Sequence, residues 1–192
     1  MKKYYLTLFA AAMLIGCGNE NTDIPAVDET QEETKDEYEG LRPFSLEKYD
    51  LNLSIMVPQV VDGEDNVIDP QVIHNMGEAT WTILMDKNFH IVIDDWGTEK
   101  QTTEMEKKRN DEGFFVYSYE EETPEHLFYS RKLGANEAGA ESGGAFYHFF
   151  VVKEINGIYY TVKSNRMSDF YKDKAKVMLK AGLSLSLPEA HL

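Results

Sequence analysis

The sequence is poor in cysteine and in long apolar runs, and both absences narrow the kinds of protein it can be. Cys17 is the only cysteine among 192 residues, so the chain can form no internal disulfide and no cysteine-based structural zinc site. After the first 16 residues, no stretch is long and apolar enough to span a bilayer as a helix. We therefore expect neither a disulfide-stabilised fold nor a transmembrane helix.

Positive charge is also scarce. The chain has 19 Lys and Arg residues against 34 Asp and Glu residues, a net charge of −15. Nucleic-acid binding depends on cationic contacts to phosphate, so an acidic chain of this kind argues against a nucleic-acid partner. The same negative charge disfavours binding to anionic lipid headgroups, whereas binding to a cationic partner is compatible with it.

The first 17 residues have the layout of an export signal. Lys2 and Lys3 precede an uncharged run of 12 residues, 4–15, which is long enough for a signal and too short to cross a bilayer. The run ends in Leu14-Ile15-Gly16-Cys17, which resembles the lipobox of bacterial lipoproteins. The resemblance implies cleavage before Cys17, lipid attachment to the Cys17 sulfur and acylation of the new amino terminus. The alternatives are an ordinary secretory signal with an incidental Cys17, or a buried N-terminal helix.

Three regions follow from this interpretation: a lipoprotein signal peptide (1–16), a lipidated cysteine with an acidic tether (17–40), and a single domain (41–192). Residues 18–40 hold nine acidic residues and one lysine, a composition that predicts a disordered spacer. A sorting signal for the cell surface is the alternative for this segment. The domain carries a net charge of −9, and its 152 residues are enough for one hydrophobic core.

Alternating apolar and polar residues predict most of the domain to be β-structure. The segment 51–57 (LNLSIMV) is typical of a half-buried strand that stops at Pro58. The other expected strands form three antiparallel pairs: 79–85 with 89–94, 114–119 with 126–131, and 146–155 with 158–164. In the last pair, Asn156-Gly157 is the favoured two-residue type I′ turn.

Two helices complete the expected order of elements. Residues 98–110 are rich in Glu and Lys, with Met105 as the one large apolar residue, which predicts a mostly solvated surface helix. Ser168 is expected to be the N-cap of a long amphipathic C-terminal helix that packs on the sheet. A broad apolar stripe is expected along it, with Phe170, Lys174, Val177, Ala181 and Leu185 on one side and Tyr171, Ala175, Met178 and Gly182 beside them.

The order of elements predicts an α+β domain: an antiparallel sheet of six to seven strands with a surface helix and a C-terminal helix packed on it. The opening YDLNLSIMVP and the run YHFFVVKEINGIYYTVKS before the closing helix resemble the PsbP-like family of α/β/α sandwiches. That resemblance implies a non-catalytic binding or assembly factor. It is an analogy of fold, which by itself does not determine function.

No catalytic motif withstands inspection. Ser142 lies in an A-x-S-x-G sequence, but a loop precedes it and a strand follows, so it lacks the strand–turn–helix of a nucleophile elbow. The five residues Asp62, Glu64, Asp65, Asn66 and Asp69 suit calcium chemically, yet their spacing is not that of an EF-hand, and a solvated loop is the favoured interpretation. His90, Asp94 and His148 form a conceivable metal site, although strand histidines are more often partly buried hydrogen-bonding groups.

Aromatic residues crowd the strand-rich half. Either helices cover both faces of the sheet, which is the favoured interpretation, or some rings form an exposed patch for a partner.

We therefore predict a non-enzymatic, lipid-anchored protein of the cell envelope, in the outer membrane, with a protein partner and with no cofactor or bound metal. Its only assigned site residue is Cys17, for lipid attachment. The alternatives are an envelope carrier of a small ligand or metal ion, and a hydrolase acting through Ser142.

Overall fold

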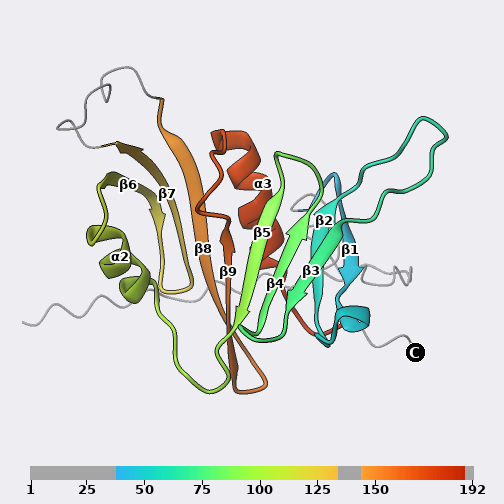
Figure 1. Ribbon diagram of the computed structural model, residues 1–192, viewed down its shortest axis with the longest axis horizontal. Coiled ribbons are helices and arrows are strands. Elements are labelled where there is room, and N and C mark those ends of the chain that lie inside the picture. The colour runs from blue at the N-terminus through green and yellow to red at the C-terminus, as the bar shows by residue number, and fades with distance from the viewer. Residues whose placement is uncertain (1–37, 134–143, 189–192) are drawn as a thin grey trace, which may run out of the picture.

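The computed structural model describes residues 38–133 and 144–188, which form nine strands and two α-helices (Figure 1). A 3₁₀ turn, Glu47–Tyr49, follows the first strand. In chain order the elements are β1 (Leu41–Ser45), β2 (Ser54–Pro58), β3 (Gln71–Asn75), β4 (Thr80–Leu84), β5 (His90–Asp95), α2 (Thr103–Asp111), β6 (Phe115–Glu122), β7 (His126–Leu133), β8 (Phe146–Ile155), β9 (Ile158–Ser164) and α3 (Lys172–Leu183).

Seven strands form one antiparallel sheet in the order β3-β4-β5-β9-β8-β7-β6, while β1 and β2 form a separate two-stranded antiparallel sheet. The C-terminal helix α3 lies against the large sheet (Figure 1). This arrangement confirms the predicted α+β class. Among the described residues, no helix is long and apolar enough to cross a membrane.

The membership of the large sheet differs from the prediction at its N-terminal side. The expected strand 51–57 begins only at Ser54 and pairs with β1, outside the large sheet. Leu51 and Leu53 are buried, but their amides bond to the carbonyls of Leu46 and Leu51 in a bend that closes the β1–β2 connection. Their alternation therefore reflects burial and not a strand. The seventh strand is β3, an edge strand that the sequence analysis missed because its apolar content is low.

The three predicted antiparallel pairs are confirmed: β4 with β5 around Asp86–Asn88, β6 with β7, and β8 with β9 around Asn156-Gly157. Asp86 holds the first turn, since its carboxylate accepts hydrogen bonds from the amides of Asn88 at 2.5 Å and Phe89 at 3.1 Å. Asn156 and Gly157 have φ values of 54° and 79°, which a type I′ turn requires at both central positions.

The main core lies between one face of the large sheet and a layer made of α3 and the β1–β2 sheet. Alternate residues of the central strands point into it, including Ile91, Ile93, Phe149 and Val162. Gly182 allows α3 to approach the sheet closely, because a Cβ there would lie 2.9 Å from the Phe149 ring. This layer creates the groove described below.

The start of α3 also differs from the prediction. Ser168 is not its N-cap; the helix begins at Lys172, with Tyr171 in the N-cap position. The preceding segment stays extended because the carbonyl of Phe170 accepts a hydrogen bond from the Tyr147 amide at 2.9 Å, and the Phe170 ring is buried. The buried stripe of α3 comprises Ala175, Met178, Leu179, Ala181 and Gly182, whereas Tyr171 is exposed.

The helix α2 packs on the opposite face, against β6 and β8 (Figure 1). It begins five residues later than expected, at Thr103, where the hydroxyl of Thr102 accepts a hydrogen bond from the Met105 amide at 3.2 Å. The expectation of a solvated helix is wrong on one side. The side of α2 that faces the sheet is buried, at Thr103, Glu106 and Asn110. Each of these side chains forms a hydrogen bond or an ion pair with a polar group there: the Thr123 carbonyl, Arg166 and Tyr119, respectively.

Candidate functional site

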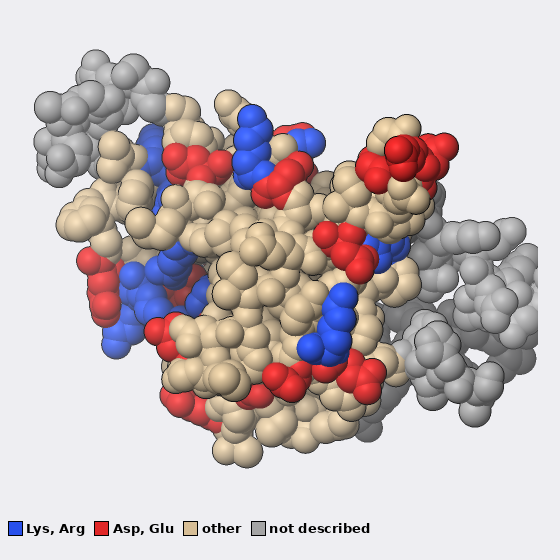
Figure 2. All heavy atoms as spheres, turned by 45° about the vertical axis from the view of Figure 1, so that its right-hand side comes forward, with Lys and Arg blue, Asp and Glu red and all other residues tan. Residues whose placement is uncertain are grey.

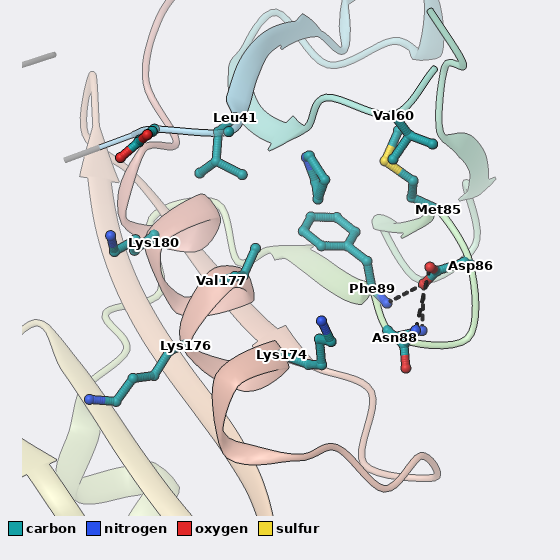
Figure 3. Close-up of a pocket in the computed structure, with 13 residues that line it drawn as sticks. Leu41, Val60, Met85, Asp86, Asn88, Phe89, Lys174, Lys176, Val177 and Lys180 are labelled. Atoms are coloured by element: carbon teal, nitrogen blue, oxygen red, sulfur yellow. Dashed lines mark hydrogen bonds between the residues drawn. The ribbon is translucent and has the colours of Figure 1, made fainter. Parts of the chain in front are cut away.

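A groove of about 540 Å³ opens between α3, the β1–β2 sheet and the β4–β5 turn (Figure 3). We call it the α3 groove. Its volume lies within the range of small-ligand pockets. The described lining residues are Glu39, Gly40, Leu41, Pro58, Val60, Met85, Asp86, Asn88, Phe89, Lys174, Lys176, Val177 and Lys180.

The interior of the α3 groove is apolar. Phe89 lies at its base and is buried, and Val177 points from α3 toward Phe89 (Figure 3). Leu41 and Met85 stand on either side. Val177 is 36% exposed because it lies outside the buried stripe of α3, so the groove offers accessible apolar surface.

Three lysines of α3 surround this apolar surface. Lys174 projects on the same side of the helix as Val177, whereas Lys176 and Lys180 project on the other side (Figure 3). Lys174 pairs with Asp173 at 3.3 Å, and Lys176 pairs with Glu121 at 3.5 Å; both pairs are largely exposed. Lys180 has no ion-pair partner within 38–133 and 144–188. Exposed ion pairs contribute little to stability, so these lysines stay available to an anionic group.

The chemistry of the α3 groove suits binding. Of its two carboxylates, that of Asp86 is engaged by the amides of the β4–β5 turn. The described lining contains no histidine, serine or cysteine. The arrangement can hold an apolar group and place negative charge beside it.

The acidic loop between β2 and β3 is organised by its own hydrogen bonds. Asp62 accepts from the Asn66 side chain and from the amides of Glu64 at 2.8 Å and Asn66 at 3.0 Å, and these bonds lower the pKa of Asp62. Asp69 instead pairs with Arg42 of β1 at 2.7 Å. Figure 2 shows the acidic side chains gathered at the tip of this loop, at the upper right. The side chains therefore hold the turn and its attachment to β1.

The histidines of the conceivable metal site have separate partners. The ring of His90 bonds to Asn165 at 2.8 Å, and burial lowers its pKa. His148 is buried and bonds to Ser164 at 2.9 Å, while Asp94 accepts from Lys163 at 2.6 Å. Across the described ranges, no three His, Cys, Asp or Glu side chains group closely enough to hold a metal ion.

The aromatic residues cover both faces of the sheet at its β6–β8 end. Phe128 and Phe149 belong to the main core, whereas Tyr129 and Phe150 join a smaller cluster with Leu127 on the α2 side. Phe114 is an exception, since it is 79% exposed. The favoured interpretation is therefore correct for most of these rings.

A buried ionic network beneath α2 was not predicted from the sequence. Glu106 is 1% exposed; its carboxylate pairs with Arg109 at 3.2 Å and with Arg166. Arg166 also donates to Asn110 at 3.0 Å, and Asn110 donates to the hydroxyl of Tyr119 at 3.2 Å. The available signal was spacing, because residues 103, 106 and 110 share one helix face and all are polar.

The predicted lipid attachment at Cys17, the tether up to residue 37, and Ser142 lie outside the described residues. Comparison with models of known protein families gives no match, and a comparison with curated protein sequences also finds none. The function is therefore inferred from the chain's own residues.

Proposed function

We propose that this protein is a lipid-anchored lipoprotein of the cell envelope, held to the outer membrane through Cys17, whose domain binds another envelope protein without catalysing a reaction. The binding site in this proposal is the α3 groove. The observation that carries it is the combination of accessible apolar surface with three neighbouring lysines, in a domain whose net charge is −9.

The groove chemistry defines the partner. The apolar base, formed by Phe89 and Val177, would receive an apolar side chain of the partner. Acidic residues beside that side chain would meet Lys174 and Lys180, and opposite charges at the rim favour the encounter and its orientation. A protein segment with an apolar residue flanked by acidic residues meets both requirements.

Site-specific photo-crosslinking tests the proposal. A photoreactive phenylalanine derivative replaces Val177 in the full chain, which is produced in cells and irradiated before the membranes are isolated. We expect one adduct of defined mass, because Val177 lies inside the groove. The control position is Met76 in the β3–β4 turn, which is 81% exposed and outside the groove.

A charge-reversed variant shows whether the adduct depends on the lysines. Lys174→Glu combined with Lys180→Glu leaves the apolar base unchanged and should remove most of the adduct at position 177. Labelling of equal strength at positions 76 and 177, or no adduct at 177, contradicts the proposal. An adduct with a small molecule in place of a protein would instead support a ligand carrier.

A further inference from the structure

A second pocket lies on the other face of the sheet, at the ends of β6, β7 and β8. Its volume is about 580 Å³. The described lining residues are Phe115, Tyr117, Arg131, Lys132, Leu133, Gly144, Phe146, Arg166, Met167 and Asp169. Tyr117, Arg131 and Phe146 are directly opposite one another on neighbouring strands, so they share the sheet face that carries α2. We call this the Arg131 pocket.

Arg131 is a nearly buried cation with most of its hydrogen-bonding capacity unused. Its side chain is 11% exposed, and its guanidinium lies 4.7 Å from the centre of the Phe115 ring. Its two hydrogen bonds are long: 3.5 Å to the Ser168 carbonyl and 3.4 Å to the Asp169 carboxylate. Its Nε is buried and has no hydrogen-bond partner in the described part of the chain. A guanidinium offers five donors, and a buried cation is costly without an anion.

Arg166, which lines the same pocket, has partners for its guanidinium. It pairs with the buried carboxylate of Glu106 and donates to Asn110 at 3.0 Å. The pairing partner of Arg131, Asp169, is by contrast 54% exposed and lies at the edge of hydrogen-bond range. Of the two arginines, Arg131 is therefore the one with donors left for a further anion.

Cationic residues outnumber carboxylates in the pocket lining. Arg131, Lys132 and Arg166 line it together with the single carboxylate of Asp169, although Arg166 is already paired with Glu106 and the domain as a whole is acidic. The neighbouring His148 lies close to two of these charges: burial first, and then the charges of Arg131 and Arg166, lower its pKa to about 3. A neutral His148 adds no competing positive charge and no counter-ion.

The walls of the Arg131 pocket are apolar. The rings of Phe115, Tyr117 and Phe146 line it, and Leu133 and Met167 extend it to the surface, where they are 48% and 93% exposed. Exposed apolar side chains beside a pocket mark a surface that gains from being covered. A ligand with one anionic group and an apolar body matches both the cation and the walls.

We propose that the Arg131 pocket binds a small amphiphilic anion, whose carboxylate, sulfonate or phosphate group is held by Arg131 and whose apolar body lies against Phe115 and Met167. Charge-assisted hydrogen bonds to the guanidinium provide orientation, and the rings and the methionine exclude water from them. This site is separate from the α3 groove and does not depend on the function proposed for that groove.

Calorimetric titration with three probes tests the assignment. The protein is the full chain carrying Cys17→Ala, which removes the predicted lipid and leaves every described residue unchanged. Octanoate combines a carboxylate with an apolar body, acetate has only the carboxylate, and 1-octanol has only the apolar body. We expect octanoate to bind at least tenfold more tightly than either of the others. Equal affinities for octanoate and octanol would overturn the proposal.

Variants locate the binding. Arg131→Gln should weaken octanoate binding by a factor of ten or more, whereas Lys180→Gln in the α3 groove should leave it unchanged. Asp169→Asn removes the carboxylate that competes for Arg131, so it should tighten octanoate binding severalfold even if Arg131→Gln fails to fold. Octanoate affinity that is unchanged in Asp169→Asn, or lost in Lys180→Gln, places the ligand elsewhere and overturns the proposal.

Discussion

Some charged side chains of this protein are buried. Glu106 is the clearest case, because its carboxylate lies beneath α2 between Arg109 and Arg166. Removing one member of a buried ion pair leaves the other charge without compensation, which costs more than the pair contributes. The network therefore determines how firmly α2 is held on the sheet.

Glu106→Gln should lower the free energy of unfolding by about 1–3 kcal/mol, because two arginines lose their shared carboxylate, although at 36% and 39% exposure water still reaches them in part. The matched control is Glu104→Gln in the same helix, where a 75% exposed carboxylate pairs with Lys107. An exposed pair of this kind contributes about 0–1 kcal/mol, so the control should differ little from the wild type. Urea denaturation measures both, and similar losses in the two variants would contradict a buried network.

His148 makes stability depend on pH in a defined direction. Burial, with Arg131 and Arg166 nearby, lowers its folded-state pKa to about 3, below the usual value of 6.5. The unfolded chain therefore binds a proton more readily, and stability is lost as pH falls from about 6.5 toward 3. Between pH 7 and pH 5 this one group should remove about 2 kcal/mol of stability.

His148→Asn tests this dependence, because it keeps a polar partner for Ser164 but cannot be protonated. We expect the variant to lose about 2 kcal/mol less than the wild type between pH 7 and pH 5. The measurement is the difference in unfolding free energy at the two pH values. Parallel pH profiles for the two proteins would show that His148 binds its proton in the folded state.

At the scale of elements, local sequence signals predicted some helices and strands, whereas tertiary packing determined others. The hairpin of β8 and β9 was predictable because the Asn156-Gly157 turn and the strand periodicity act over neighbouring residues. The start of α3 was not, because the hydrogen bond from Tyr147 holds Phe170 in extended backbone, and Tyr147 is distant in sequence. β3 was missed for a related reason, since its place in the sheet depends on pairing with β4.

Gly182 sets how closely α3 approaches the sheet. Alanine in a helix is favoured over glycine by about 1 kcal/mol, but overpacking a core costs about 1–3 kcal/mol. The new Cβ in Gly182→Ala would meet the fully buried Phe149 ring at 2.9 Å and Val162 at 3.3 Å, so we expect a net loss of about 1 kcal/mol. Gly63→Ala, where a Cβ meets nothing within 4 Å, is the control for thermal unfolding. A stabilised Gly182→Ala variant would refute the close approach.

At the scale of the whole molecule, the large sheet presents two different surfaces. One face carries α3, the β1–β2 sheet and the α3 groove, and the other carries α2 and the Arg131 pocket. Figure 2 shows acidic and basic side chains distributed around a broad uncharged area, so the net charge of the chain does not describe its local surfaces. Cationic sites persist on this acidic protein because specific elements bring Lys and Arg side chains together.

Cys17→Ala tests where the whole protein resides. If Cys17 carries the lipid, this change should abolish incorporation of labelled palmitate and move the protein from the membrane fraction to the soluble fraction. Two or more acyl chains are needed for stable attachment, so loss of the cysteine should release nearly all of the protein. Ser142→Ala serves as a control that should keep both the label and the membrane association. Labelling that persists without Cys17 would refute the lipoprotein interpretation.

The sequence alone determined the α+β class, the three hairpins and the acidic balance, because turn chemistry, periodicity and composition act locally. It also defined the lipobox resemblance at Cys17, which remains a prediction. Only the tertiary structure decided that β2 leaves the large sheet, that Glu106 is buried, and that Lys174 and Arg131 line separate pockets. The physical reason is that the partners of these residues come from distant parts of the chain, so no local pattern encodes them.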